Sequence, residues 1–356
     1  MDDVHGVVPR SLDEIDLAVL HALQIDARAP WTRIAAVIGV DAATVVRHWS
    51  ALRADGLAWL TAWPTPQRWS STTDLGIVLL DSRTPGDALA AVVQRPWVLS
   101  VDETSAGYLA LVATSAGLAR LGDRARELSD DGAPVLRMDV AASIVAEDST
   151  WRLAVLSAAQ QRSLRAGGPA DAAAGVARQA AVGQTAMGSA AAVKPVAGTR
   201  PIAAATVAEI AAALDEDPRM PAATLAVRLG VSEATARRTL ERVTAAGLLR
   251  FGCDLAMPAA GFRRGVVLWG RSDDPEGAAT RAVRLPEVHR AGILVGAAPL
   301  FVCLRARSLT ALPAVERSWG ADVEITDRWT VLRSMKRNGH VLDADGRSVA
   351  RVAPSW

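Results

Sequence analysis

The chain has few of the residues that mark disulfide-rich, metal-binding or membrane proteins. Its 356 residues include two cysteines, Cys253 and Cys303, which form no CxxC pair and lie near no histidine cluster. A disulfide framework or a zinc site is therefore not expected. No run of about 18 apolar residues is present, so no transmembrane helix is predicted. The first residues are acidic and polar, unlike a signal peptide, and the sequence predicts a cytoplasmic protein.

The chain also lacks an excess of charge of either sign. The chain carries 39 basic and 38 acidic residues, which gives a formal net charge of +1. Because no strong global field results, nothing in the overall charge points to nucleic acid, a membrane surface or an acidic substrate. Any such partner has to be inferred from local groups of residues.

One long segment lacks large apolar residues. Residues 165–201 consist almost entirely of alanine, glycine, valine and small polar residues, and they include six glycines and three prolines. Such a composition buries too little surface to offset the entropy lost on ordering, so a flexible linker is predicted. An alanine-rich helix is the alternative.

The two halves on either side of this segment carry a repeated sequence. GVDAATVVRHWSALRADGLA begins at Gly39 and GVSEATARRTLERVTAAGLL begins at Gly230, with eight of twenty positions identical. Internal repetition of this kind indicates two copies of one structural unit. The sequence therefore predicts a tandem duplication.

Each half begins with a pattern typical of three helices. The first helix is predicted from SLDEIDLAVLHAL and TVAEIAAALDED, with capping boxes at Ser11/Glu14 and Thr206/Glu209. The second helix opens at Pro30 or Pro221 and ends at Gly39 or Gly230. The third is capped by Asp41 or Ser232 and ends at Gly56 or Gly247.

The remainder of each half predicts the order β-α-β-β-α-β, which is typical of ferredoxin-like domains. The expected fold class is α+β, with two winged or helix-turn-helix headpieces, each followed by a ferredoxin-like domain. The predicted domains are a first helix-turn-helix domain at 1–63, a first ferredoxin-like domain at 70–150, a helix plus linker at 151–203, a second helix-turn-helix domain at 204–255, a second ferredoxin-like domain at 262–343 and a tail at 344–356. The helix at 152–165 is expected to dock on the first half through Leu153, Leu156 and Leu164, and the tail is expected to be solvated.

The third helix of each unit has the pattern of a DNA reader. Its buried face would carry Val45, Trp49 and Leu52, or Ala236, Leu240 and Val243 in the second half. The opposite face would then present arginine and threonine to the major groove, where arginine can bond two guanine acceptors. The predicted DNA-binding residues are Asp41, Thr44, Arg47, His48, Arg53, Ser232, Thr235, Arg237, Arg238, Thr239 and Arg242. The alternative is a solvated face on a purely structural bundle.

These stretches resemble the headpiece of the Lrp/AsnC (feast/famine) transcriptional regulators. The resemblance implies a headpiece followed by a ferredoxin-like effector domain, and it assigns the recognition-helix arginine to Arg47 and Arg238. The family's effector turn, Gly-x-Tyr-Asp-like, is matched only in part by Gly107, Tyr108 and Gly296, because Leu109 and Ala110 stand where the acid is expected. We therefore expect an amino-acid-like effector to bind at these three residues, although the acidic side chain that would pair with its ammonium group is missing.

The resemblance also implies that single-unit relatives dimerise through their sheets. Two units on one chain could then form this pair intramolecularly, as a pseudo-dimer at high effective concentration, with or without further oligomerisation. Because the repeats differ at Val46/Arg237 and His48/Thr239, an asymmetric DNA site is expected.

The sequence lacks the common catalytic and cofactor motifs. It has no GxGxxG after a strand, no GxxxxGK[ST], no GxSxG, and five scattered histidines without metal spacing. The carboxylates of DETS and DEDPR are expected to be solvated. No cofactor, no metal and no enzymatic activity are therefore predicted. Two alternatives stay open: a tetrapyrrole-processing enzyme of the sirohaem decarboxylase type, similar to this family in architecture, and a ligand sensor that no longer binds DNA.

Overall fold

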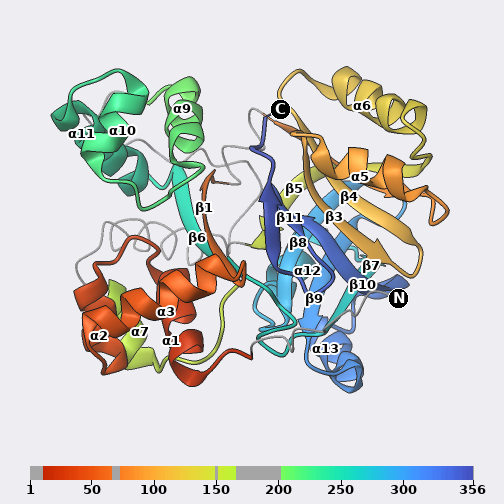
Figure 1. Ribbon diagram of the computed structural model, residues 1–356. Coiled ribbons are helices and arrows are strands. Elements are labelled where there is room, and N and C mark those ends of the chain that lie inside the picture. The colour runs from red at the N-terminus through yellow and green to blue at the C-terminus, as the bar shows by residue number, and fades with distance from the viewer. Residues whose placement is uncertain (1–10, 66–72, 149–150, 166–201, 356) are drawn as a thin grey trace, which may run out of the picture.

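The computed structural model describes residues 11–65, 73–148, 151–165 and 202–355. The predicted linker lies almost wholly outside these residues. Within them, no helix combines the length and the apolar character needed to cross a membrane. Two groups of helices lie beside a large sheet, with a narrow two-stranded ribbon between the groups (Figure 1).

The first group of helices comprises α1 (Glu14–Ile25), α2 (Trp31–Ile38) and α3 (Ala42–Ala54). Helix α2 begins after Pro30 and ends at Gly39, whose φ of 79° is the left-handed conformation that suits glycine. Helix α3 is capped by the Asp41 side chain, which accepts a hydrogen bond from the backbone N–H of Thr44. The expected proline start and glycine stop are present.

The second group comprises α9 (Ala204–Leu214), α10 (Ala222–Leu229) and α11 (Glu233–Ala245). Helix α10 follows Pro221 and ends at Gly230, with φ of 65°. The Ser232 hydroxyl caps α11 by accepting from the backbone N–H of Thr235. In both groups the third helix follows the second after a glycine turn.

The two predicted capping boxes of the first helices are wrong. Helix α1 is capped two residues later than expected, by a reciprocal pair between Asp13 and Asp16. An aspartate carboxylate caps as well as a serine hydroxyl, so the sequence allowed either register. Helix α9 begins at Ala204 with no side-chain cap, which places Thr206 inside its first turn.

A ribbon that the sequence did not predict joins the two groups. Strand β1 (Ala58–Pro64) pairs antiparallel with β6 (Leu249–Leu255), although about 190 residues separate them. Arginines make reciprocal contacts beside it. Arg28 donates to the carbonyls of Pro218 and Met220, and Arg219 donates to those of Ala27 and Ala29. The guanidinium of Arg219 also lies 3.7 Å from the ring centroid of Trp31.

The large sheet contains two successive strand–helix–strand–strand–helix–strand segments. The first consists of β2 (Asp74–Leu80), α5 (Gly86–Gln94), β3 (Val98–Thr104), β4 (Gly107–Thr114), α6 (Leu118–Asp130) and β5 (Val135–Ala146). The second consists of β7 (Arg264–Arg271), α12 (Pro275–Ala282), β8 (Val288–Val295), β9 (Leu300–Ala306), α13 (Leu312–Trp319) and β10 (Glu324–Arg337), with the short turn η2 (Leu309–Ala311) before α13.

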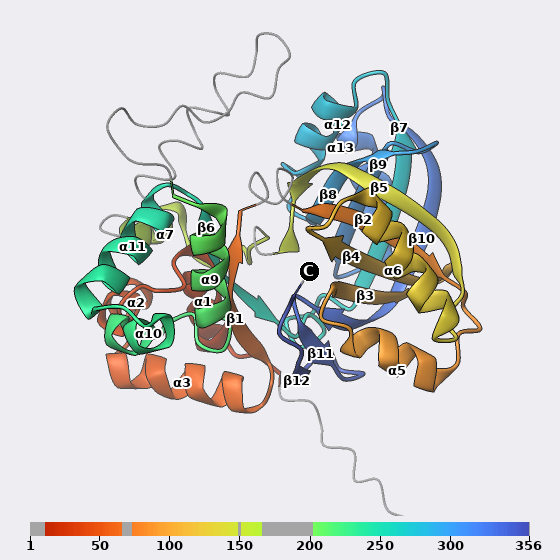
Figure 2. The ribbon, with the colours of Figure 1, turned by 90° about the horizontal axis from the view of Figure 1, so that it is seen from above.

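The two segments close into one eight-stranded barrel. Its order is β10-β3-β4-β2-β5-β8-β9-β7, and β7 pairs back to β10. The joins between segments are β5 with β8 and β3 with β10, both antiparallel. Closure leaves these eight strands with no free edge. Helices α5 and α6 cover one side of the barrel, and α12 and α13 cover another (Figure 2).

Side chains fill the barrel and the space beneath the helices. The interior cluster includes Trp269, Phe301 and Trp329, whose rings lie about 5 Å apart. Alternate residues of the same strands point outwards into separate clusters under α5 and α6, and under α12 and α13. Because successive residues of a strand point to opposite faces, each strand contributes side chains both to the barrel interior and to the cores beneath the helices.

The C-terminal residues are ordered against both parts of the molecule, so the prediction of a solvated tail is wrong. Strands β11 (His340–Leu342) and β12 (Ser348–Arg351) extend the sheet beyond β10. The backbone of Ser348 donates to Gly56 at 2.8 Å, and Arg351 forms an ion pair with Asp215. Arg351 is thereby held by a protein partner.

The segment after β5 docks on the first group of helices. Only residues Ala158–Arg165 are helical (α7), which is shorter than predicted. Leu153, Leu156 and Leu164 are buried in the same cluster as α1 and α3, as the apolar stripe indicated. The Nδ1 atom of His21 accepts hydrogen bonds from the backbone N–H groups of Val155 and Leu156.

Candidate functional site

Helix α3 packs one face against the protein and exposes an arginine on the opposite face. Val45, Trp49 and Leu52 are buried, as predicted, and they fix the orientation of the helix. Arg47 and Arg53 are exposed on the other side, and Thr44 is half-buried and donates to the Asp41 carboxylate at 2.7 Å. Arg47 is thus in a position to approach a duplex.

Helix α11 has the same arrangement with more arginines. Ala236, Leu240 and Val243 are buried, and Arg237, Arg238 and Arg242 are exposed. Thr235 and Thr239 are half-buried, and the Thr239 hydroxyl donates to the Thr235 carbonyl at 2.8 Å. The three arginines are therefore accessible to a partner in solvent.

The expected exposure of His48 is wrong. Its side chain is 13% exposed, and Nδ1 lies 2.7 Å from Oδ1 of Asp16, which is itself buried in α1. Asp13 lies on the same side, so these three residues bring two carboxylates and an imidazole within 4.8 Å of one another. The contacts hold α3 against α1, because the carboxylates also cap that helix.

Of the three residues predicted to bind an effector, Gly107 and Tyr108 begin strand β4, and Gly296 directly follows β8. Gly107 has φ of 137°, and a Cβ atom there would lie 2.3 Å from the Leu80 carbonyl oxygen. Tyr108 packs partly against the cluster under α5 and α6. A Cβ atom on Gly296 would lie 2.8 Å from a carboxylate oxygen of Asp139. Backbone geometry accounts for Gly107, whereas Gly296 makes room for the Asp139 side chain. Effector binding at these residues stays a prediction.

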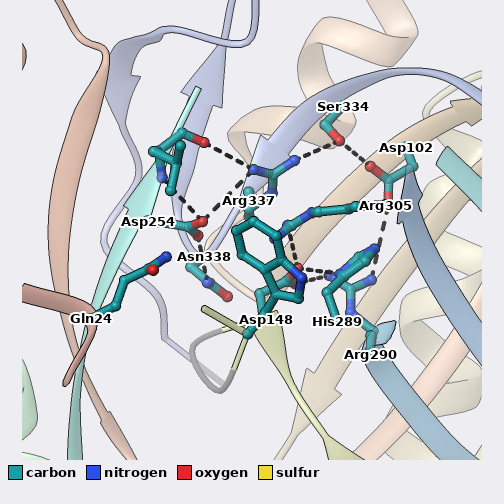
Figure 3. Close-up of polar contacts among 12 residues, drawn as sticks. Gln24, Asp102, Asp148, Asp254, His289, Arg290, Arg305, Ser334, Arg337 and Asn338 are labelled. Atoms are coloured by element: carbon teal, nitrogen blue, oxygen red, sulfur yellow. Dashed lines mark hydrogen bonds and ion pairs between the residues drawn. The ribbon is translucent and has the colours of Figure 1, made fainter. Parts of the chain in front are cut away.

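A group of buried charges that the sequence did not predict lies at one end of the barrel. Asp148, just after β5, is within 2.6 Å of Nδ1 of His289 and of Nη2 of Arg305, and it also pairs with Arg290 (Figure 3). Asp102 of β3 accepts from the Ser334 hydroxyl at 2.5 Å and lies 3.9 Å from Arg290. The expected solvation of the DETS carboxylates is therefore wrong for Asp102.

Burial and mutual charge set the protonation of this group. Burial works to raise the pKa of Asp148, but the cations Arg290 and Arg305, with His289, hold that pKa well below its usual value. Burial lowers the pKa of His289 to about 3, so its imidazole is neutral at pH 7 and Nδ1–H donates to Asp148. Burial, together with nearby Arg337, lowers the pKa of Arg305 to about 10.

The polar contacts continue from the barrel towards the ribbon. Arg337 donates to the Ser334 hydroxyl and to the Leu255 carbonyl, and it lies 3.7 Å from a carboxylate oxygen of Asp254. Asp254 also accepts from the Asn338 side chain. One residue earlier, the Cys253 carbonyl accepts from Gln24 of α1. These contacts connect the barrel end with both β6 and the first helix.

Long-range pairing explains why the sequence gave no sign of this group. Asp148, His289, Arg305 and Asp254 come from four separate segments, and none of them belongs to a recognisable motif. One signal was available. His289, Arg290 and Arg305 are polar or charged residues within the otherwise apolar, buried strands β8 and β9, which is unusual.

Comparison with known families identifies the first three helices. Residues 12–53 match the AsnC-type helix-turn-helix domain. No curated protein sequence matches the chain. The structure of AsnC from E. coli shares 24% identity and covers 37% of this chain and 94% of its own, with a TM-score of 0.32. The feast or famine regulatory protein from M. tuberculosis, complexed with L-methionine, shares 19% identity and covers 36% of this chain and 92% of its own, with a TM-score of 0.33.

A different class of protein matches almost the whole chain. The crystal structure of the siroheme decarboxylase NirDL has a TM-score of 0.52 with 13% identity, and it covers 91% of this chain and 93% of its own. At this identity the match shows a shared fold. The prediction that the chain is not an enzyme is contradicted, because an enzyme uses the same fold over nearly its full length.

The residues that match this domain form helices α1 to α3, and the third of these helices exposes Arg47. Residues 12–53 are accordingly an AsnC-type helix-turn-helix domain.

Proposed function

We propose that the protein is a sequence-specific DNA-binding regulator that presents two recognition helices, α3 and α11. The observation that carries the proposal is that Arg47 and Arg238 are exposed at equivalent positions of the two helices. Each follows a side-chain cap and stands opposite a buried apolar face. Arginine in this position can make the two-pronged contact with guanine that gives direct readout.

The proposal includes a tandem architecture. Helices α9 to α11 would be a second headpiece, and the two barrel segments would be two ferredoxin-like units paired within one chain. The repeated sequence, the reciprocal contacts of Arg28 and Arg219, and the closed barrel all support it. The proposed readers are Arg47, Arg237 and Arg238, with Thr44 and Thr235 beside them, and His48 no longer belongs to the set. The proposal also includes a cytoplasmic location and an amino-acid-like effector.

A DNA selection followed by a binding titration tests the proposal. Duplexes selected from genomic fragments by the full chain should bind with an affinity that falls steeply as salt rises, because phosphate contacts release counterions. The Arg238→Ala variant should lose about 1–3 kcal/mol of specific binding, since one bidentate base contact is worth that much. Fluorescence anisotropy on the selected duplex measures both effects.

The control for this titration is Arg126→Ala, which removes an exposed arginine from α6, away from both recognition helices. It should bind the duplex as tightly as the unmodified chain. Equal affinity of Arg238→Ala and Arg126→Ala would remove the support for α11 as a reader. Absence of any salt-dependent duplex binding would favour the ligand sensor that does not bind DNA.

A second candidate function is decarboxylation of a carboxylated tetrapyrrole. The fold match to siroheme decarboxylase NirDL over 91% of the chain favours it, as does the neutral His289 held beside Arg290 and Arg305. The guanidinium groups would bind substrate carboxylates. The cavity at this site measures about 90 Å³, against about 300–1,000 Å³ for drug-sized ligands, so a macrocycle would require the site to open.

Adding sirohaem to the purified chain tests this candidate. A substrate complex should shift the tetrapyrrole absorption band in a saturable way, and turnover should release carbon dioxide. His289→Ala should lower turnover while Arg126→Ala leaves it unchanged. A spectrum identical to that of free sirohaem at every protein concentration would reject the candidate.

A further inference from the structure

The barrel end holds a small cavity that is lined by buried charged side chains. The cavity has a volume of about 90 Å³, and its lining includes Asp102, Asp148, Arg290, Arg305 and Arg337. Three guanidinium groups thus face two carboxylates, while the neighbouring His289 is neutral. Arg263 and Arg264, which are exposed, stand at the rim.

One of these guanidinium groups is incompletely bonded. Arg305 is 4% exposed, and its Nη1 atom is buried without a hydrogen-bond partner among the described residues. Its Nη2 atom already donates to Asp148 at 2.6 Å. A buried N–H group without an acceptor costs about 1–3 kcal/mol, more when it is charged, so an acceptor is expected here.

The neighbouring carboxylates bond to other groups, and none of them accepts from this Nη1 atom. Asp148 serves Arg290, Arg305 and His289, and Asp102 accepts from Ser334. Asp254 serves Arg337 and Asn338. After these contacts, the Nη1 atom of Arg305 still has no acceptor among the described residues.

We propose that this cavity binds a small oxyanion, a phosphate or a compact carboxylate, through Arg305 and the adjacent Arg290. The volume corresponds to about three water molecules at about 30 Å³ each, which suits an anion of this size. Two planar guanidinium groups provide parallel N–H donors that match the oxygens of such an anion. The site is independent of the proposed DNA binding, because no cavity-lining residue belongs to α3 or α11.

Calorimetric titration of the full chain at about pH 7.5 tests the site with inorganic phosphate and, separately, with malonate. Sodium chloride at equal ionic strength corrects for general salt effects. Saturable one-site binding of either probe supports the proposal, and the probe that binds identifies the class. Absence of saturable binding by both probes overturns it.

Two substitutions locate the binding. Arg305→Gln removes the charge and the donor fork, and it should weaken binding at least about tenfold, as expected for the loss of a charge-assisted hydrogen bond. Asp148→Asn removes a competing negative charge and should tighten binding. The matched control, Arg126→Ala, should bind as the unmodified chain does. Equal weakening in Arg305→Gln and Arg126→Ala would contradict the site.

Hydrogen exchange on the unmodified chain provides a test that does not depend on folding of the variants. Saturating probe should slow exchange in residues 288–306, which contain β8 and β9. Slowed exchange confined to residues 233–245 of α11 would instead place the anion on the recognition helix and overturn the proposal. Duplex binding can fail or succeed in either case, so the two proposals fail separately.

Discussion

Acidification from about pH 7 to about pH 5 is expected to remove most of the stability of this protein. Burial lowers the pKa of His21 to about 4 and of His289 and His340 to about 3, against 6.5 for an unperturbed histidine. Between these folded-state pKa values and 6.5, the three histidines are therefore protonated in the unfolded chain and neutral in the folded chain. Stability is full above about pH 6.5 and falls as the pH drops towards the folded-state values.

The contacts of the three imidazoles show why the folded state excludes the proton. Nδ1 of His21 accepts two backbone N–H groups, so it cannot carry a hydrogen. Arg152 and Arg165 also repel a charge there. His289 faces Arg305 and Arg290 as well as Asp148, and His340 faces Arg351. Each ring contributes about 1.4 kcal/mol per pH unit, or about 2 kcal/mol by about pH 5.

Two carboxyl groups work in the opposite direction. Burial raises the pKa of Asp215 and of Asp254, despite their arginine partners, so the folded chain takes up these protons before the unfolded chain does. At the low end of the pH range, these two carboxyl groups therefore recover part of the lost stability. The net loss remains large, because three histidines act together against a folding free energy of about 5–15 kcal/mol.

Urea unfolding followed by circular dichroism at several pH values measures this effect. His340→Phe keeps a ring against Trp59, whose centroid lies 4.9 Å away, but it cannot be protonated. It should move the loss of stability to lower pH. Ser348→Ala removes the same hydrogen bond and retains the titrating ring, so it should not move it. A stability that is flat between about pH 7 and about pH 5 contradicts the assignment.

Asp148→Ala is expected to destabilise the protein by about 3–5 kcal/mol. The substitution leaves Arg290 and Arg305 buried without the carboxylate that compensates them, and an uncompensated buried charge is costly. Asp148 is 5% exposed, so solvent cannot replace the lost partner. The urea midpoint at about pH 7.5 measures the change.

The matched control is Asp322→Ala, which removes an aspartate paired with Arg281 at the surface. Its side chain is 51% exposed, so water can replace the lost partner and the loss should be much smaller than for Asp148→Ala. Equal midpoints for the two variants would show that the barrel-end charges contribute no more than a surface ion pair. Asp148→Asn, which retains the shape and loses the charge, should fall between them.

Local patterns predicted the helices of the headpieces well. The proline at the start of α2, the glycine at its end and the Asp41 cap of α3 each act within a few residues. The same is true of the buried stripe Val45, Trp49 and Leu52. His48 was assigned to the wrong surface because its partner, Asp16, lies 32 residues away in another helix.

The sequence by itself determined the repeated headpiece signal and the order of strands and helices in each segment, because caps, turns and apolar periodicity are properties of neighbouring residues. Only the tertiary structure decided the ribbon between β1 and β6, the closure of the barrel and the meeting of Asp148 with Arg290 and Arg305. Those features depend on pairing between strands far apart in the chain, and single-strand patterns carry no information about which partner a strand will choose.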